Sequence, residues 1–450
     1  MQPPPPHPSP ASGRGGKRET HSLTIGVIGG GYAGMAAAVT LAHHGIPVTV
    51  LESARQLGGR ARGVLHNDTQ LDNGQHILLG CYRHTLHLIE LVGGNVADDF
   101  LHLPLQLTLH QRFELKAPRL PAPLHLLMGL LTAKGLNTAD SVRAARFMLA
   151  MRWRKFRLER DTPALALLQA WGQNDKLIRL LWEPICISAL NTPVHKASAQ
   201  VLLNVLRDSL NGSRADSDML LPRLDFSALF PDRAACYLEQ HGGQVLRSCT
   251  VEGIQPQDGG IELATSQGPM RFSQVICAAS PASSARLFGA VPVLAGMAAQ
   301  IAAIPYQPIY TVYLQCPPHV SLPQSMLGLD RCYTQWLFDK GRIAGQAGLI
   351  AAVISAEGAH QELPHELLAQ KVAQELRDHF GIHEQPLWHK VIAEKRATFA
   401  CEVGLQRPQH STPLPGLWLA GDYTANDYPA TLEGAVISGI AAATQLLQHA

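Results

Sequence analysis

Three glycines and one glutamate near the start of the chain have the types and spacing that a phosphate-rich ligand requires. Gly29, Gly31 and Gly34 form a Gly-x-Gly-x-x-Gly run, and Glu52 follows 18 residues after the last of them. In such a run the first glycine permits a tight turn, the second lets the backbone approach a pyrophosphate, and the third lets a helix pack close to a strand. An acid at Glu52 would accept hydrogen bonds from a ribose diol and disfavour a 2′-phosphate. The pattern predicts a dinucleotide site that is not an NADP site.

The residues around these glycines predict the elements that must hold them in place. Residues 23–28 are apolar and β-branched, residues 35–43 are rich in alanine and leucine, and residues 47–52 have the pattern of a second strand. Together they predict one strand–helix–strand unit. The N-terminus of its helix would present free N–H groups and the positive end of the helix dipole to phosphates.

Three further elements decide between NAD and FAD. The run Gly58-Gly59-Arg60 follows Glu52 closely; its glycines would let the backbone pass near phosphate, and its arginine would add a charge-assisted contact to phosphate or flavin. Far along the chain, Gly421-Asp422 follows a predicted strand at 417–420, where an aspartate suits a polyol such as ribityl. A helix start at 429–435 would stabilise the negative charge of a reduced flavin. An NAD dehydrogenase would not need these elements, so the three in this order predict FAD.

Composition limits the class of protein further. The chain has 450 residues, 46% of them apolar and 16% charged, which predicts two to three domains with a large core. A net charge of +2 excludes binding of nucleic acid through an overall positive charge. The 8 cysteines form no Cys-x-x-Cys pair, and no apolar run is long enough to span a membrane, which favours a reduced, cytoplasmic setting. The 21 histidines include pairs without a third ligand at suitable spacing, so no metal site is predicted.

The order of the predicted elements indicates an α/β fold with a discontinuous domain. Residues 1–22 are rich in proline and predict a disordered tail. We expect an FAD-binding Rossmann-like domain from residues 23–95, 225–285 and 400–450, and a mixed α+β substrate domain from residues 96–224 and 286–399. The leucine-rich residues 100–210 have the pattern of helices for the most part.

Within this leucine-rich part, residues 140–160 predict a helix capped by Thr138 or Asp140, whose last turns combine basic residues with Trp153 and Phe156. Basic and aromatic residues together are typical of an interfacial anchor, and a cluster that serves only the helix dipole is the alternative. We expect peripheral contact with the cytoplasmic membrane.

Together, the glycine run, Glu52, the Gly58-Gly59-Arg60 element and Gly421-Asp422 resemble the superfamily of flavin amine oxidases and phytoene desaturases. The runs at 71–80, 181–186, 189–193 and 428–436 resemble, within it, the hydroxysqualene dehydroxylase family, also called squalene-associated FAD-dependent desaturases. The resemblance covers residue 23 to the C-terminus. It implies that a reduced flavin delivers hydride to hydroxysqualene, whose hydroxyl leaves as water to give squalene, a precursor of hopanoids. It also implies a long apolar pocket, with walls that we expect from residues 100–210 and 300–400.

Such a reaction needs a general acid beside the flavin. By the superfamily pattern residues 72–76 run beside the ring, so His76 is a candidate, unless it only orients the turn while Gln75 bonds the cofactor. Glu183 lies in an apolar stretch that would raise its pKa, although an ion pair with an arginine is equally consistent. Glu433 is a third candidate, but the helix dipole alone would favour an acid there. The predicted cofactor contacts are Gly29, Gly31, Gly34, Glu52, Gly59, Arg60, Gly74, Gln75, Val251, Gly421, Asp422, Thr431 and Leu432.

Other functions share this pattern. A carotenoid-type desaturase would run the flavin chemistry in the oxidative direction, and sequence alone does not fix the direction. An amine oxidase is disfavoured because no aromatic pair that would cage an amine is evident. A non-catalytic escort of prenylated proteins, of the Rab-GDP-dissociation-inhibitor type, is disfavoured because the predicted FAD site is complete. There is no second glycine-rich unit for NAD(P)H, so we expect electrons from a transient donor or a partner such as another pathway enzyme.

Overall fold

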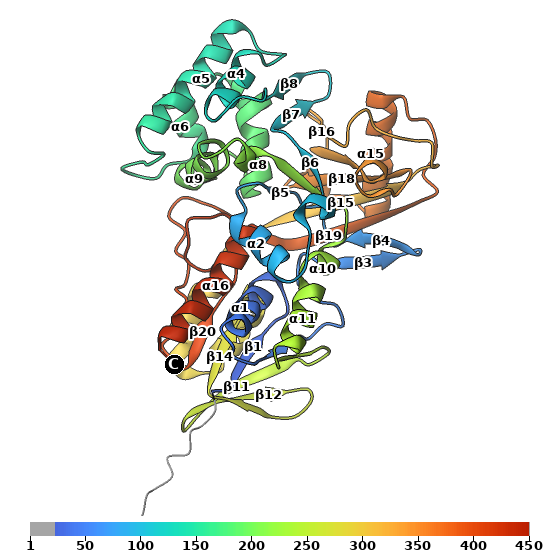
Figure 1. Cartoon of the computed structure of the whole chain (residues 1–450). Helices are drawn as coiled ribbons and strands as arrows, with labels where there is room; N and C mark the ends of the chain where they lie inside the picture. The colour runs from blue at the N-terminus through green and yellow to red at the C-terminus, as the bar shows by residue number, and fades with distance from the viewer. Residues whose placement is uncertain (1–22, 450) are drawn as a thin grey trace, which may run out of the picture.

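The computed structural model describes residues 23–449, and the tail predicted at residues 1–22 lies outside them. Figure 1 shows two halves: a lower one around a sheet flanked by α1, α11 and α16, and an upper one with helices on one side and an antiparallel sheet on the other. This mixture of sheets and helices is the α/β fold that the sequence predicts.

The lower half is built on a parallel sheet of five strands in the order β10-β2-β1-β14-β20. Its central strand pairs Ile25 with Val48 on one side and with Gln274 on the other. All residues of β1 are buried, as expected for a parallel sheet covered on both faces. The strands come from three distant parts of the chain: β1 (Ile25–Ile28), β2 (Val48–Leu51), β10 (Gln244–Leu246), β14 (Gln274–Cys277) and β20 (Leu417–Leu419).

Helices cover this sheet and are packed tightly against one another. The last helix, α16 (Leu432–Gln448), lies against the first, α1 (Tyr32–His43). A Cβ on Gly439 would lie 2.1 Å from the carbonyl oxygen of Ala33, so the two backbones meet without side chains between them. Around them lie α2 (Arg83–Leu91), α3 (Val96–Asp99), α10 (Phe226–Leu229), α11 (Pro231–Gln240), α12 (Pro281–Gly289) and the three-stranded meander β11 (Val251–Gln257), β12 (Gly260–Thr265) and β13 (Met270–Phe272).

One wall of the upper half is a sheet of seven strands in the order β19-β15-β18-β17-β16-β7-β8. Its pairs are antiparallel except for the short contact between β16 and β7. Helix α15 (His365–Phe380) contacts β15 and β19. The strands and adjoining helices are β7 (Gln106–Leu109), β8 (Phe113–Lys116), β15 (Tyr306–Gln315), β16 (Met326–Gly328), β17 (Trp336–Asp339), β18 (Leu349–Ser355), β19 (Trp388–Phe399), α13 (Ala295–Ala302) and α14 (Lys340–Ala344).

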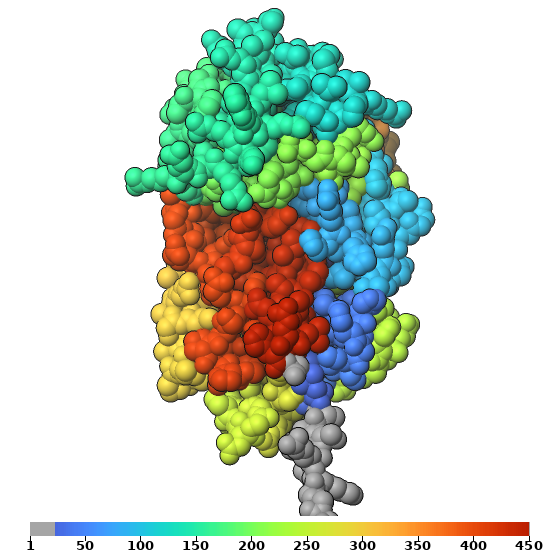
Figure 2. Space-filling view, turned by 60° about the vertical axis from the view of Figure 1, so that its left-hand side comes forward, coloured from blue at the N-terminus to red at the C-terminus, as the bar shows by residue number. Residues whose placement is uncertain are grey.

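The other wall is a group of helices, which forms the top of the molecule in Figure 2. No helix within residues 23–449 has the length and apolar character needed to cross a membrane. The short helix α7, a π-helical turn η1 and α8 follow one another without a break. The helices are α4 (Leu124–Leu131), α5 (Thr138–Trp153), α6 (Ala164–Ala170), α7 (Asp175–Leu177), η1 (Ile178–Trp182), α8 (Glu183–Leu190) and α9 (Ala199–Leu210).

Two predictions about this upper half are wrong in detail. Residues 100–116 are strands, not helices, because Leu107, Leu109, Phe113 and Leu115 are buried at every second position, the period of a strand. The strands in this range are β6 (Phe100–Leu103), β7 and β8. Strand β6 pairs with β9 (Met219–Pro222), and β9 also pairs with β5 (Leu78–Leu79). A separate hairpin consists of β3 (Gly63–His66) and β4 (Thr69–Asp72).

The second correction concerns the helix predicted at residues 140–160. Its N-cap is Asn137, whose side chain accepts a hydrogen bond from the Asp140 N–H, and α5 ends at Trp153. Lys155 and Phe156 then adopt positive φ angles of 53° and 54°, so the chain turns away. The basic residues from Arg154 onward therefore lie on a loop beyond the helix end.

Candidate functional site

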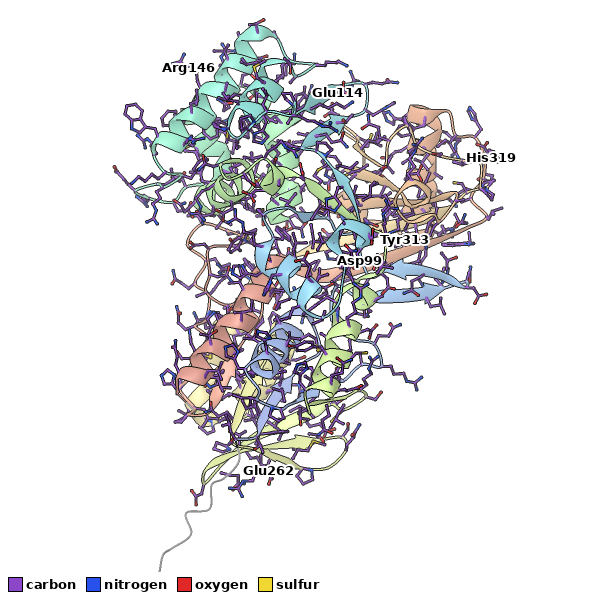
Figure 3. All side chains as sticks on the ribbon, in the orientation of Figure 1. Asp99, Glu114, Arg146, Glu262, Tyr313 and His319 are labelled. Carbon is purple, nitrogen blue, oxygen red and sulfur yellow. The ribbon has the colours of Figure 1, made fainter. Side chains whose placement is uncertain are left out.

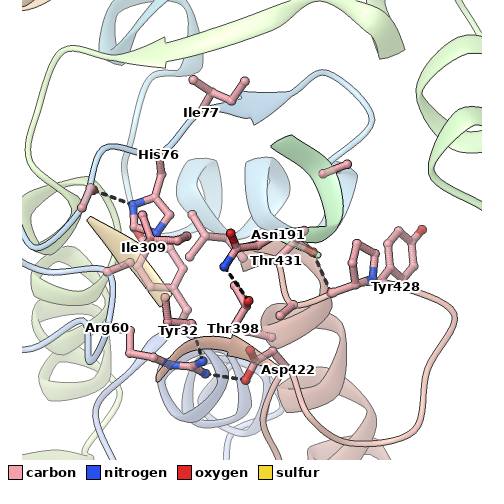
Figure 4. A pocket seen from close by; sticks show the side chains of 18 of the residues that line it. Tyr32, Arg60, His76, Ile77, Asn191, Ile309, Thr398, Asp422, Tyr428 and Thr431 are labelled. Carbon is pink, nitrogen blue, oxygen red and sulfur yellow. Dashed lines mark hydrogen bonds and ion pairs between the residues drawn. The ribbon is translucent and has the colours of Figure 1, made fainter. Parts of the chain in front are cut away.

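A cavity of roughly 790 Å³ lies where the lower and upper halves meet. Its lower end is lined by the turn after β1, by residues 58–62 and by the start of α16, and its upper end by α4, α8, α9 and the seven-stranded sheet. Figure 4 shows Arg60, Asp422 and Tyr32 at one side of the drawn region and Ile77 at the other. Polar and apolar ends thus belong to one continuous space.

At the lower end, the first glycines hold the backbone in shapes that side chains would prevent. Gly29 has a φ of +104°, and a Cβ there would meet the Ala278 carbonyl oxygen at 2.7 Å. A Cβ on Gly34 would lie 1.9 Å from the Gly29 carbonyl oxygen, so α1 packs onto the turn only because Gly34 has none. Gly31 faces the backbone of Gly59, and a Cβ on Gly31 would have no neighbour closer than 3.8 Å. The part of the cavity at the N-terminus of α1, called the nucleotide channel below, is therefore lined by glycine backbone.

Glu52 ends the second strand beside this channel. One carboxylate oxygen accepts a hydrogen bond from Gly30 N at 2.6 Å, and the other accepts one from Ala54 N at 2.8 Å. The residue is only 8% exposed, and it lines the cavity. Two backbone donors fix the orientation of the carboxylate, while its remaining lone pairs are available to hydroxyl donors in the channel.

Arg60 and Asp422 form an ion pair between parts of the chain that are distant in sequence. Their side chains are 2.5 Å apart, and Arg60 also donates to the Ala397 carbonyl at 2.8 Å. Burial alone would lower the pKa of Arg60, but the charge and hydrogen bond of Asp422 outweigh it and raise that pKa. Gly421, which precedes the aspartate, has a φ of +148°. The pair connects the loop after β2 to the end of β20 and lines the cavity (Figure 4).

His76 lies on the segment that crosses the middle of the cavity. Its Nδ1 is 2.7 Å from the Gly74 carbonyl oxygen, and its ring packs against Phe226 with centroids 5.0 Å apart. Because a carbonyl only accepts, the neutral ring carries its proton on Nδ1 and presents Nε2 as an acceptor. Burial lowers the pKa of His76 below its usual value of 6.5. The structure thus provides a neutral imidazole at neutral pH, in the lining of the cavity.

Sequence analysis missed a buried lysine behind this segment. Lys340 is 4% exposed, and its Nζ donates to the Oε1 of Gln75 at 3.3 Å. Burial lowers the pKa of Lys340, although the charge of Asp72 opposes this. Burial raises the pKa of Asp72 to about 6 despite the nearby lysine. A single lysine in the sequence gives no signal for such a position, because only the folding of β17 against β18 brings it behind Gln75.

Two polar residues in the cavity wall also had no predicted role. Asn191 ends α8 with a left-handed φ of 46° and donates to Thr398 Oγ1 at 2.9 Å and to the Pro308 carbonyl at 3.2 Å. Its own side-chain oxygen accepts from Ala356 N at 2.7 Å. Asn191 therefore connects α8 to three strands of the seven-stranded sheet. Thr398, which accepts from it, can direct its hydroxyl proton into the cavity (Figure 4).

Glu183 does not reach the cavity, contrary to its predicted catalytic role. Burial raises the pKa of its carboxyl, as expected for an apolar stretch. However, the neighbours that line the cavity are Trp182, Ile185 and Ser188, whereas Glu183 is absent from the lining and lies near His195. The turn of α8 directs this side chain elsewhere, so we do not propose it as a proton donor.

Glu433 is also directed away from the cavity. It is 1% exposed and accepts hydrogen bonds from the backbone N–H groups of His84 and Thr85 at 3.0 and 2.9 Å. The Thr85 hydroxyl donates to it as well, at 2.6 Å. The carboxylate thus caps the N-terminus of α2 and holds α2 against α16. This structural role leaves no free oxygen for catalysis.

The predicted cofactor residues are placed together with one exception. Gly34 is behind the turn rather than in the cavity wall, where it permits the close packing described above. Thr431 is the N-cap of α16 and accepts from Gly434 N at 3.1 Å. Those in the lining are Gly29, Gly31, Glu52, Gly59, Arg60, Gly74, Gln75, Val251, Gly421, Asp422, Thr431 and Leu432.

These features fit a flavin nucleotide. The N-terminus of α1 has no side-chain cap, and Gly31 and Gly59 line the cavity beside it without side chains that would keep a pyrophosphate from the backbone. Glu52 can accept from ribose hydroxyls, and the N-terminus of α16 reaches the cavity near its middle. The fold and the cavity therefore define a nucleotide-binding protein in which the cofactor residues adjoin a large apolar chamber.

Comparison with known proteins identifies the family. The sequence pattern described as flavin containing amine oxidoreductase matches residues 32–447, and the chain belongs to this family. It is a flavin-dependent oxidoreductase. The chain is 29% identical to a hydroxysqualene dehydroxylase of Rhodopseudomonas palustris, over 95% of this chain and 99% of that protein. It is 27% identical to a hydroxysqualene dehydroxylase of Zymomonas mobilis (94% and 99% covered) and 21% identical to a zeta-carotene desaturase of Arabidopsis thaliana (97% and 86% covered).

Solved structures share the fold at low sequence identity. A triple mutant of putrescine oxidase superposes with a TM-score of 0.72 at 15% identity and covers 95% of this chain and 100% of its own. Cyclohexylamine oxidase from Brevibacterium oxydans gives a TM-score of 0.68 at 17% identity, with 95% and 99% covered. These similarities establish the architecture and leave the substrate to be argued from the cavity.

Proposed function

We propose that this protein is an FAD-dependent enzyme that converts hydroxysqualene to squalene. The observation that carries the proposal is the continuity of the cavity, in which a glycine-lined nucleotide channel opens directly into an apolar chamber. The similarity to hydroxysqualene dehydroxylases over nearly the whole of both chains supports the choice of substrate. A C30 hydrocarbon with one hydroxyl needs a chamber of this kind, because its apolar surface is most stable away from water.

The proposed cofactor is FAD, and the residues in the channel suggest how the chain holds it. Glu52 would accept hydrogen bonds from the adenosine ribose, and the amides at the start of α1 would bind the pyrophosphate. Asp422, oriented by Arg60, would accept from the ribityl hydroxyls. The start of α16 would place its positive dipole end at the pyrimidine edge of the ring.

In the proposed reaction the allylic C–O bond of hydroxysqualene breaks and a C–H bond forms at the same carbon. Bound reduced FAD supplies the hydride, and the oxygen leaves as water after it receives a proton. The chain supplies the chamber that excludes water and orients the carbinol. We propose His76 as the proton carrier, because its Nε2 has no proton in the neutral ring and can take one up and release it in the lining of the cavity. Since its pKa is lowered, the protonated ring would be a stronger acid than free histidine, but a scarcer one at neutral pH.

A carotenoid-type desaturation is the second candidate, because the chain is also similar to zeta-carotene desaturases over most of its length. The same apolar chamber would accept a polyene without a hydroxyl. In that case the oxidised flavin would receive hydride, and the proton carrier at His76 would act as a base instead.

Electrons would enter or leave through a transient donor, acceptor or partner protein. In either direction the apolar substrate places the enzyme, in our proposal, at the cytoplasmic surface of a membrane.

One anaerobic experiment tests the direction. The bound flavin is reduced, hydroxysqualene is added, and the extracted lipid is analysed by mass spectrometry while the flavin absorbance is followed. We expect squalene to form in step with flavin reoxidation. If the flavin stays reduced and no squalene forms, the dehydroxylase proposal fails, and oxidised enzyme with polyene substrates becomes the next test.

A further inference from the structure

Two neighbouring helices of the upper half expose apolar side chains in parallel stripes. On α4 the stripe consists of Leu124, Met128 and Leu131, which are 50%, 40% and 48% exposed. On α5 it includes Val142, Leu149 and Trp153, of which Trp153 is 90% exposed. The spacings of three, four and seven residues place each set on one face of its helix. Six of the eleven large apolar side chains exposed within residues 23–449 therefore gather on this α4/α5 face.

The same helix and the loop that follows it are rich in basic residues. Helix α5 carries Arg143, Arg146 and Arg152 against Asp140, which pairs with Arg143, and the loop at residues 154–160 adds four basic residues and Glu159. Arg146 lies within the α5 stripe and points outward in Figure 3, and Arg152 and Arg157 lie near its end. Within residues 23–449, none of these three arginines forms an ion pair with a carboxylate. Their charges are therefore available to an external anionic surface.

A narrow hollow lies between these helices and leads toward the large cavity. It has a volume of only about 20 Å³ and is lined by Leu127 and Leu149 near the surface and by Leu126, Met148 and Leu210 deeper in. The last three side chains also line the large cavity. Each of them is no more than 8% exposed. They form a single layer of flexible apolar side chains between the outer hollow and the substrate chamber.

We propose that the α4/α5 face docks on an anionic lipid bilayer and that the hollow between the two helices is the portal through which the apolar substrate enters the chamber from the lipid. The apolar stripes insert at the acyl boundary, and the arginines bind lipid phosphates. Movement of the Leu126, Met148 and Leu210 side chains opens the portal, since Leu and Met change rotamers without breaking hydrogen bonds. This inference rests on the proposed function for the identity of the substrate, but the docking itself does not.

Charge and continuity favour a bilayer over a second copy of this chain. Two copies of this face would bring Arg146 and Arg152 of each chain together across a two-fold axis, where like charges repel. A bilayer also explains why the exposed stripes lie directly over a hollow that leads to the substrate chamber. A second copy would seal the hollow instead.

Sedimentation of the flavin-loaded full-length protein with vesicles tests the docking. We expect binding to mixed phosphatidylcholine–phosphatidylglycerol vesicles, weaker binding to phosphatidylcholine alone, and a loss of roughly tenfold in the double variant Leu149→Glu, Trp153→Glu. Leu387→Glu is the matched control, because Leu387 is 68% exposed but lies outside this face. Equal binding of wild type and double variant would overturn the proposal. A concentration-dependent dimer that the double variant abolishes would assign the face to a second copy and would overturn it too.

The portal is tested without turnover, so that its failure is distinct from a failure of the proposed reaction. Vesicles loaded with squalene are mixed with oxidised enzyme, and the perturbation of the flavin spectrum is followed over time. Leu127→Trp would fill the hollow and should slow this perturbation about tenfold, while flavin content stays unchanged. Leu387→Trp, which lies outside both the hollow and the α4/α5 face, should behave as wild type. If Leu127→Trp and wild type respond at the same rate, the substrate enters elsewhere.

Discussion

The two ends of the cavity are lined by different kinds of groups. At the nucleotide end polar side chains and glycine backbone line the cavity, and the shape of the backbone depends on glycines at single positions, such as Gly29, Gly34 and Gly421. At the chamber end the surface consists of apolar side chains from helices and a sheet that are far apart in sequence. A backbone surface tolerates almost no substitution, whereas apolar side chains exchange for one another at modest cost. The first end therefore determines which cofactor binds, and the second can change its substrate within one family.

The sharpest test of this contrast is Gly34→Ala. The new methyl group would lie 1.9 Å from the Gly29 carbonyl oxygen, so α1 must move away from the turn. We expect purified protein without bound flavin and a fall in the free energy of unfolding of about 3 kcal/mol. Absorbance near the flavin maximum and denaturant unfolding measure the two effects. Gly296→Ala is the control, because a Cβ there meets no atom within 4 Å; equal flavin contents in the two variants would refute the packing argument.

The next largest effect is expected on turnover, at the boundary between the two ends. His76→Gln removes the titrating ring and should slow the proposed reaction about 100-fold while the flavin stays bound. Because the pKa of His76 is lowered from 6.5, its protonated fraction grows only as the pH falls below that value. The wild-type rate should thus rise toward acid pH, and the variant should lose this rise. A variant with an unchanged pH–rate profile would leave His76 with an orienting role only.

Asp422→Ala tests whether the nucleotide end depends on its ion pair as well as on backbone. The change leaves the Arg60 guanidinium without its partner at 2.5 Å. We expect FAD affinity to fall about 30-fold, because a partly buried charge without its partner costs roughly 2 kcal/mol. Titration of flavin-free protein with FAD, followed by flavin fluorescence, gives the dissociation constant. Asp422→Asn keeps an acceptor but not the charge and should lose about as much affinity; wild-type affinity in this variant would show that charge pairing is not the cause.

A substitution that fills the chamber should lower substrate turnover and leave flavin binding unchanged, the opposite of a substitution at the nucleotide end. Ile185 on α8 lines the upper end, and Ile185→Trp would occupy space that the substrate needs. We expect kcat/KM for the C30 substrate to fall about tenfold, with the flavin spectrum and FAD affinity unchanged. Ile185→Val, which removes one methyl group, is the matched control and should stay close to wild type. Loss of flavin in the tryptophan variant would show that the two ends are not independent.

The smallest effect concerns stability alone. Asp72 lies behind the cavity segment with its pKa raised from 3.8 to about 6. A folded state that holds the proton more tightly is stabilised below pH 3.8, and that contribution is lost as the pH rises through about 6. Asp72→Asn mimics the protonated form and retains the acceptor for Phe226 N. We expect a flatter dependence of unfolding free energy on pH between these values. A slope equal to that of wild type would assign the pH dependence to other groups.

The contrast between the two ends also explains how much the sequence could predict. The α/β fold and the grouping of Glu52, Arg60 and Asp422 followed from short patterns, because glycines and acids at strand ends have few other uses. Strands β7 and β8 were misread as helices, since leucine content concealed their alternation. Glu183 and Glu433 remained candidates for catalysis beside their structural alternatives, because a sequence does not show which way a helical side chain points. Lys340 and Thr398 escaped notice because only long-range pairing of strands brings them to the site.

The contact between Gly439 of α16 and Ala33 of α1 has a consequence for biosynthesis. The glycine turn and α1 leave the ribosome long before β20 and α16, which complete the sheet edge and cover α1. A nascent chain that ends before β20 thus carries the glycine run, Glu52 and Gly58-Gly59-Arg60 without Gly421-Asp422, and it exposes the alanine-rich surface of α1 until α16 has been made. We therefore expect flavin to bind late, and we expect a chain truncated before Leu417 to keep the first glycine run but to bind no flavin.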